Sequence, residues 1–231
     1  MDPRFRIIIA IDDLGIEQTL HLASAIGDQV EAFKIHALYD RHGPGVVKQL
    51  KKAGVRRVWV DAKLHDKPSV VYQRAADIAV SGADIVSVHA SGGTKMMQAA
   101  VGARIEVYAI TILASLGEND VLSLYGRPAA TVVLGLTQLA FESGVTGIVC
   151  SPKEIEYVAR HKSQLALVAD EPTDRLDGTG TEYRQQAGTL ATALKAGADY
   201  LVVGHRITSA PDPSAALDEL EREIYGEQAK G

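Results

Sequence analysis

The chain has 231 residues and a net charge of −5, and its composition excludes several classes of protein. It has no basic block or arginine-rich face, which argues against nucleic acid as a partner. The single cysteine, Cys150, excludes a disulfide framework and a cysteine-based zinc site. Every apolar run is shorter than a membrane span, and acids interrupt the N-terminal segment "MDPRFRIIIAIDD", unlike a signal peptide. We therefore expect a soluble cytoplasmic protein.

Short apolar runs rich in valine and isoleucine alternate with amphipathic segments along the chain. These runs lack the alternating pattern of a half-exposed strand, so they predict strands buried on both faces, as in a parallel sheet. The predicted strands are 5–12, 30–36, 56–63, 83–90, 105–111, 146–151, 165–170 and 199–204. The predicted helices are 16–27, 43–53, 69–81, 92–102, 128–143, 152–161, 184–196 and 212–225.

Glycine marks the ends of several predicted helices, in "KAGV" (52–55), "VSGAD" (80–84), "ESGV" (142–145) and "KAGAD" (195–199). Eight strand–helix units in a chain of this length predict an α/β fold, a single (β/α)8 TIM barrel spanning 1–231. Residues 212–231 are expected to form a C-terminal helix with a frayed tail. A doubly wound open sheet is the structural alternative. The least regular segments, 112–127 and 170–183, are predicted to be binding loops or lids.

In such a barrel, function lies at the C-terminal ends of the strands. The polar residues at these ends are Asp12, Lys34, Asp61, Lys63, His89, Thr111, Ser151, Asp170 and His205. Within "VDAKLHDKPSVV" (60–71), Asp61 and Lys63 are two residues apart and should share the interior face of their strand. Lys34 ends the preceding strand and Asp66 lies in the following loop, so these four residues form an array of alternating charge.

This array has two interpretations. It could be a buried ion-pair network that only satisfies itself, but burying charges costs several kcal/mol per ion, and a structural bridge needs two charges rather than four. Alternatively, the flanking carboxylates keep Lys63 as an ammonium ion. An ammonium ion argues against a Schiff-base lysine and for a proton donor to a developing carbanion.

The same residues resemble a known family. "DAKLHDKPSVV" resembles the D-x-K-x-x-D signature of the orotidine 5′-phosphate decarboxylase family. Further segments are similar in order along the chain: "IIIAIDD", "AFKI", "GADIVSVHASGGTKMMQAA", "TILASLGENDVLSLYG" and "GADYLVVGHRIT". The resemblance implies a carbon–carbon lyase of pyrimidine biosynthesis that converts orotidine 5′-monophosphate to UMP without a cofactor or metal. It also implies a homodimer with shared active sites.

The resemblance implies a role for each matched residue. Lys63 would protonate carbon 6 while Asp61 lies against the departing carboxylate. Lys34 would bind the ribose and hold Asp61, and Asp66 would reach into the partner subunit's site. The remaining substrate-binding positions are Asp12 for a ribose hydroxyl, Ser115 for the pyrimidine, and His89 at the barrel mouth.

The chain departs from the family pattern at the substrate's outer contacts. The threonine expected to contact the neighbouring ribose is Val70, and Lys67 adds a charge beside it. The P-G-I-R-P segment expected after the seventh strand is replaced by the acidic "VADEPTDRLDGTG". We expect the phosphate to be held by backbone N–H groups and three side chains. These are Arg184, His205 and Arg206.

Because of these departures, two further functions stay open. One is a related sugar-phosphate decarboxylase or aldolase, acting for example on ketogulonate or hexulose phosphate. The other is a non-catalytic ligand-binding paralogue that keeps the charged array. Some enzymes of the wider group use magnesium, for which Asp12, Asp61 and His89 would be the candidate ligands. The two lysines already neutralise these acids, which argues against a metal.

Overall fold

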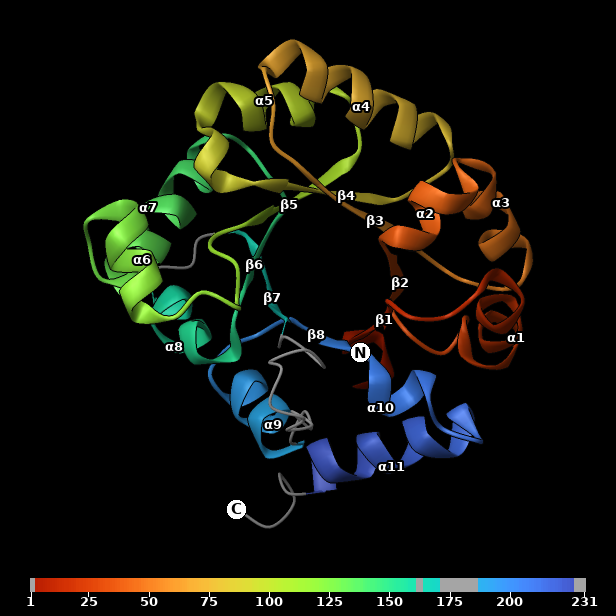
Figure 1. The fold of residues 1–231 in the computed structure, drawn as a ribbon. Helices are drawn as coiled ribbons and strands as arrows, with labels where there is room; N and C mark the ends of the chain where they lie inside the picture. Colours follow the sequence, from red (N-terminus) through yellow and green to blue (C-terminus); the bar gives the residue numbers. More distant parts are fainter. Residues whose placement is uncertain (1–2, 161–163, 171–186, 227–231) are drawn as a thin grey trace.

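The computed structural model describes residues 3–160, 164–170 and 187–226. They form a closed barrel of eight parallel strands with helices on its outside, as Figure 1 shows in a view along the barrel axis. The strands pair in chain order, and β8 closes the barrel against β1. The structure confirms the (β/α)8 prediction and excludes the open doubly wound sheet.

All eight strands lie at the predicted places, with ends that differ by no more than two residues. They are β1 (Ile7–Ile11), β2 (Ala32–Ile35), β3 (Val58–Leu64), β4 (Ile85–His89), β5 (Glu106–Ile110), β6 (Gly147–Cys150), β7 (Ala166–Asp170) and β8 (Tyr200–Val203). Their residues are almost all buried, as expected for strands covered on one face by helices and on the other by the barrel interior.

Helices follow the strands and surround the barrel. They are α1 (Ile16–Ile26), α2 (Ala37–His42), α3 (Gly45–Lys52), α4 (Pro68–Val80), α5 (Thr94–Gly102), α6 (Glu118–Tyr125), α7 (Ala129–Glu142), α8 (Pro152–Arg160), α9 (Ala187–Lys195), α10 (His205–Thr208) and α11 (Pro213–Gly226). Two 3-10 turns are η1 (Pro3–Arg6) and η2 (Ala90–Gly92). In the described part of the chain, no helix is long and apolar enough to cross a bilayer.

Three helices were not predicted, and one of them corrects an expectation. Segment 112–127 was predicted to be irregular, but it contains α6, which begins after Gly117 and ends at Gly126 in the left-handed region. The short helices α2 and α10 escaped prediction because each has too few residues to show a helical period. The other predicted loop was 170–183. Its first residue, Asp170, ends β7, and residues 171–183 lie outside the described residues.

The glycines predicted to stop helices all have the backbone conformation that this role requires. Gly54, Gly82, Gly144 and Gly197 have φ values of 110°, 95°, 76° and 113°. Residues with a side chain rarely adopt such positive φ values. Glycine at these positions therefore ends a helix and turns the chain into the next strand at little steric cost.

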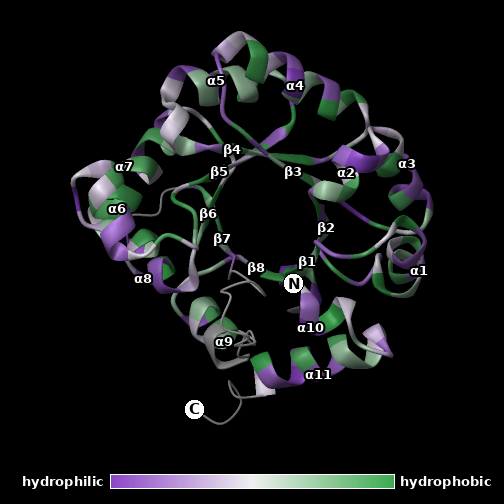
Figure 2. Ribbon diagram, viewed as in Figure 1, coloured by the Kyte–Doolittle hydropathy of each residue, from purple (hydrophilic) through white to green (hydrophobic). Residues whose placement is uncertain are grey.

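Hydrophobic residues form two separate cores. The larger lies between the strands and the surrounding helices, and the smaller fills the barrel interior, where Trp59 and Tyr108 meet edge to face with ring centroids 5.3 Å apart. In Figure 2, hydrophobic colouring predominates along the strands, and the helices carry both hydrophobic and hydrophilic colours. The interior core ends below the C-terminal edge of the barrel, and a polar site begins there.

Candidate active site

The interior face of several strands changes from apolar to polar toward the C-terminal end. On β3, Trp59 belongs to the interior core and Asp61, two residues later, faces the mouth of the barrel. On β2, Ala32 is followed in the same way by Lys34, whose ammonium nitrogen lies 5.6 Å from the centre of the Trp59 ring. The strand period therefore gathers charged side chains directly above an aromatic floor.

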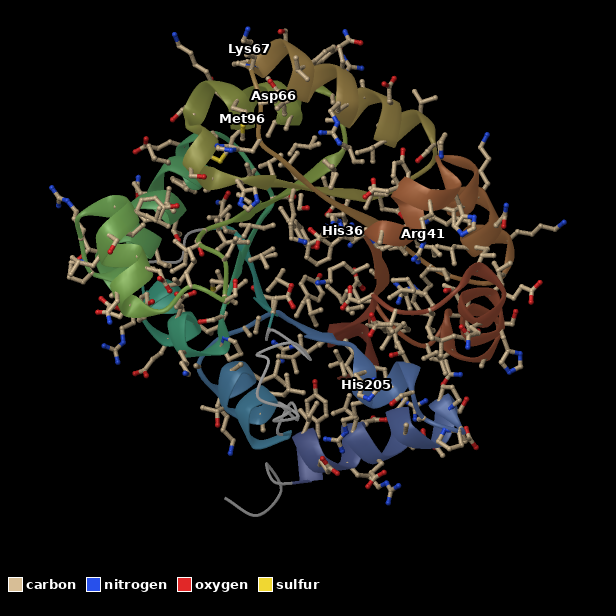
Figure 3. All side chains as sticks on the ribbon, viewed as in Figure 1. His36, Arg41, Asp66, Lys67, Met96 and His205 are labelled. Atoms are coloured by element: carbon tan, nitrogen blue, oxygen red, sulfur yellow. The ribbon has the colours of Figure 1, made fainter. Side chains whose placement is uncertain are left out.

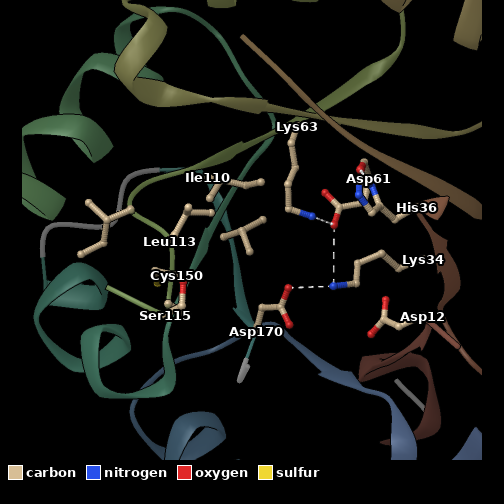
Figure 4. Close-up of a pocket in the computed structure, with 13 residues that line it drawn as sticks. Asp12, Lys34, His36, Asp61, Lys63, Ile110, Leu113, Ser115, Cys150 and Asp170 are labelled. Carbon is tan, nitrogen blue, oxygen red and sulfur yellow. Dashed lines mark hydrogen bonds and ion pairs between the residues drawn. The ribbon is translucent and has the colours of Figure 1, made fainter. Parts of the chain in front are cut away.

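These side chains line a cavity of about 260 Å³ at the mouth (Figure 4). Its polar residues are Asp12, Lys34, His36, Asp61, Lys63, Ser115 and Asp170. Its apolar residues are Ile110, Ile112, Leu113, Ala114, Val149 and Cys150. Charged groups on one side and an apolar wall on the other suit a small ligand that has a flat apolar part and polar substituents.

Asp61 is the centre of the charged cluster. It is 2% exposed, and its Oδ2 forms an ion pair with Lys63 and lies 3.8 Å from Nζ of Lys34. Nζ of Lys34 also lies 2.8 Å from Oδ2 of Asp170. The predicted alternation of lysine and aspartate is therefore present on β2 and β3, with Asp170 as a second acid beside Lys34.

Lys63 is held in an unusual backbone conformation. Its φ is +46°, and the register between β3 and β4 shifts between Val60 and Leu64, which is the mark of a β-bulge. A non-glycine residue in this region costs on the order of 1–3 kcal/mol. The buried hydroxyl of Ser87 offsets part of this cost, because it accepts the Lys63 backbone N–H at 3.0 Å and donates to Asp61 Oδ1.

His36 is a pocket residue that the sequence did not identify. Its Nδ1 lies 2.7 Å from the backbone carbonyl of Asp61. A carbonyl only accepts hydrogen bonds, so Nδ1 carries the proton, and the ring supports the backbone of β3 next to the bulge. Ser87 was missed as well, although its position two residues before His89 places it on the interior face of β4.

The charges shift one another's pKa values. Burial by itself would raise the pKa of Asp61, but Lys34, Lys63 and the hydrogen bond from Ser87 outweigh it and hold that pKa below its ordinary value. Burial would lower the pKa of Lys34, but the carboxylates around it, Asp170 foremost, raise it. Limited hydration raises the pKa of Asp12, and Lys34 only partly opposes this. The site therefore keeps Asp61 and Lys34 ionised.

The structure brings only some of the predicted site residues together. Lys34, Asp61, Lys63, Asp12 and Ser115 all line the cavity. Asp66 does not join them within one chain. It is exposed at the start of α4, where its Oδ1 accepts the backbone N–H of Lys67 at 2.6 Å, and Figure 3 shows both residues at the outer edge of the barrel.

The remaining substrate-binding predictions that fall on described residues do not line the cavity. His89 ends β4 and packs edge to face against His65, and burial lowers its pKa. His205 begins α10, as Figure 3 shows, and Nη2 of Arg206 lies 2.5 Å from Oε2 of Glu223 on α11. Arg184 lies outside the described residues. Their predicted roles stay predictions.

A closed (β/α)8 barrel with an aspartate–lysine cluster in a cavity at its mouth defines a barrel enzyme that works with charged side chains. Residues 6–220 match the family model described as "Orotidine 5'-phosphate decarboxylase / HUMPS family". This match covers most of the chain, so the protein belongs to that family.

Individual relatives agree with this assignment. The chain is 38% identical to the orotidine 5′-phosphate decarboxylase of Anaeromyxobacter sp. (strain K), over 94% of this chain and 96% of the relative. It is 37% identical to that of Thermobifida fusca, over 94% and 95%. The crystal structure of the enzyme from Lactobacillus acidophilus superposes with a TM-score of 0.79 at 29% identity, covering 94% of this chain and 98% of that one.

Proposed function

We propose that this protein decarboxylates orotidine 5′-monophosphate to UMP, in pyrimidine biosynthesis, without a cofactor. The observation that carries the proposal is the Asp61–Lys63 ion pair beside Lys34, built on a bulged strand inside the cavity. Family membership and the named relatives support the choice of substrate.

The proposed reaction balances without an external electron donor or acceptor. The bond between carbon 6 and the carboxylate breaks, the electron pair stays on carbon 6, and carbon dioxide leaves. The ammonium group of Lys63 gives its proton to carbon 6, and the neutral lysine takes a proton back from solvent. Before cleavage, the ammonium also attracts the negative charge that develops on that carbon.

Asp61 supplies the opposing charge in this proposal. It is buried and its pKa is held low, so it stays ionised next to the place of the substrate carboxylate. Two carboxylates repel each other in the ground state, and the repulsion disappears as neutral carbon dioxide forms. Lys34 holds Asp61 in place from the other side, at 3.8 Å.

We also propose that the protein works as a homodimer in the cytoplasm, with Asp66 completing the partner's site. Asp66 is exposed outside its own cavity, and Val70 and Tyr72 on the helix that follows it, α4, are 37% and 43% exposed. A second copy that covers this helix would bury these apolar groups and bring Asp66 to a mouth.

Mixing two inactive variants tests the shared site. Asp66→Asn and Lys63→Ala subunits should each have little activity, whereas their mixture should regain part of it, because one hybrid site then has both native residues. A mixture that is as inactive as its components would refute the shared site. Full activity of a protein that sediments as a monomer at the assay concentration would refute it too.

Ultraviolet absorbance separates this function from its rivals, because decarboxylation changes the absorbance of the pyrimidine. The purified protein should consume orotidine 5′-monophosphate at an unchanged rate in EDTA, and should leave ketogulonate and hexulose phosphates untouched. Turnover of a sugar phosphate with sensitivity to EDTA would favour the aldolase alternative. Binding of nucleotide without turnover of any of these compounds would favour a non-catalytic paralogue.

A further inference from the structure

Asp170 makes an ion pair across the mouth of the barrel. It is the last residue of β7, and its Oδ2 lies 2.8 Å from Nζ of Lys34 on β2. Two strands, β8 and β1, separate β7 from β2 in the barrel. Lys34 is closer to Asp170 than to Asp61, at 3.8 Å, so its ammonium is directed toward the β7 side of the cavity (Figure 4).

This side of the cavity is rich in carboxylates. Asp12 at the end of β1 lies on the same side of the site, and its pKa is raised by limited hydration and then by Asp170 and Asp61, against the opposing effect of Lys34. One ammonium therefore serves several acids, and the local charge is negative. Such a place repels a phosphate and offers acceptors to hydroxyl groups.

We propose that Asp170 is a specificity-determining residue that accepts a hydrogen bond from a ribose hydroxyl of the substrate, while Lys34 donates to a neighbouring hydroxyl oxygen. The inference rests on the proposed function, because it concerns the sugar of that nucleotide. It also gives a role to an acid that the sequence places among the polar residues at the strand ends without assigning it one.

The geometry suits this role better than a purely structural one. A carboxylate offers about four lone-pair positions, and the bond to Lys34 uses one of them. The side chain of Asp170 is 28% exposed and lines the cavity, so acceptor positions remain open toward a ligand.

The test combines a side-chain deletion with deletions of substrate hydroxyls. kcat/KM is measured for orotidine 5′-monophosphate and for its 2′-deoxy and 3′-deoxy analogues, with the native protein, Asp170→Ala and Asp170→Asn. The matched control is Asp28→Ala, which removes an exposed carboxylate from the turn between α1 and β2 at the opposite end of the barrel.

We expect Asp170→Ala to lose about tenfold or more with the full nucleotide, since hydrogen bonds to charged groups are among the stronger ones. For the analogue that lacks the bonded hydroxyl, the loss should shrink to within about twofold, because the substrate then has nothing for Asp170 to bind. Asp170→Asn, which keeps an acceptor oxygen, should recover part of the activity. Asp28→Ala should behave as the native protein does.

Equal losses with all three substrates would overturn the inference, because Asp170 would then act only by holding Lys34. No loss with the full nucleotide would overturn it too. Failure of the native protein to turn over orotidine 5′-monophosphate would defeat the proposed function and this inference together. That outcome is visible before any variant is measured.

Discussion

The two ends of the barrel both carry partly buried ionic clusters, but the clusters differ in what surrounds them. At the N-terminal end, Arg57 lies 2.6 Å from Glu31 and 2.6 Å from Glu106. Arg6, in η1, donates to the backbone carbonyls of Asp199 and Ala198 at 3.0 Å and 2.6 Å. At the C-terminal end, the charges of Asp61 and Lys63 line a cavity instead.

The difference separates structural charge from functional charge. At the N-terminal end, the charges bind one another and backbone groups next to a closing turn, so their effect is on stability. At the mouth, the charges face space for a ligand, and one of them, Lys63, has a strained backbone. Strain that the surrounding structure maintains is typical of functional sites. The following predictions test this contrast.

The largest expected effect is at Lys63. Lys63→Ala should lower kcat by about 10²- to 10⁴-fold or more, the usual contribution of a positioned proton donor, while nucleotide binding measured by calorimetry stays nearly unchanged. Lys63→Arg should not restore the rate, because a guanidinium gives up its proton too reluctantly. Lys52→Ala, an exposed lysine at the end of α3, is the control. Substantial turnover by Lys63→Ala would show that the proton comes from elsewhere.

The opposite result is expected at the N-terminal end. Arg57→Met should leave kcat/KM within about twofold but lower the free energy of unfolding by about 3 kcal/mol, because it strands the buried Glu31 without its partner. In a chain of this size, that corresponds to a melting temperature lower by roughly 6–12 °C. Arg56→Met is the control, since exposed Arg56 only covers the ring of Phe5 and should cost about 1 kcal/mol or less. A large kinetic defect in Arg57→Met would remove the contrast.

A smaller kinetic effect is predicted for the phosphate contacts. Arg184→Ala and Arg206→Ala should each lower kcat/KM by about tenfold or more, because a lost charge-assisted contact is worth about 1.5–3 kcal/mol. Binding energy from a remote phosphate can also lower the barrier, so part of the loss should appear in kcat. Glu223→Gln separates the arginine from its ion pair, because it removes the charge of Glu223 and keeps Arg206. Native rates in both arginine variants would show that the phosphate is held in another way.

The smallest expected effect is a pH dependence of stability. The pKa of Asp61 is lower in the folded protein than its ordinary value of 3.8, so Asp61 contributes stability at neutral pH. That contribution is complete above the ordinary value and is lost as the pH falls through the folded value. In chemical denaturation, the native protein should therefore lose more stability below about pH 4 than Asp61→Asn does. If the free energy of unfolding falls equally with pH in the two proteins, the ionisation of Asp61 does not contribute to stability.

The sequence was informative where the chemistry repeats along the chain. Buried apolar runs and helix-ending glycines such as Gly82 and Gly197 predicted the barrel. Because the C-terminal ends of its strands meet at one edge, Lys34, Asp61 and Lys63 could be placed together. The short helix α10 and the turn η1 were not predictable, since their residues show no period.

The rest of the site depends on three-dimensional contacts that a linear pattern does not contain. The bulge that places Lys63 depends on the hydroxyl of Ser87, 24 residues away. Asp170 was visible as an acid at a strand end, but its contact with Lys34 crosses the mouth between residues 136 apart in the chain. The cluster around Arg57 was missed for the same reason. Asp66 could be placed in the loop before α4, but a contact with a partner's site involves a second copy of the chain, which a linear pattern does not contain.

The central claim, that the mouth of the barrel protonates carbon 6 without a cofactor, is tested most directly by running the reaction in D₂O. The protein is first treated with EDTA and supplied with orotidine 5′-monophosphate, and the product is examined by proton NMR. The account predicts UMP with one deuterium at carbon 6 from the native protein, and formation of this product at least about 100-fold more slowly by Lys63→Ala. Absence of UMP with the native protein, or its formation only after a metal is added, would contradict the account.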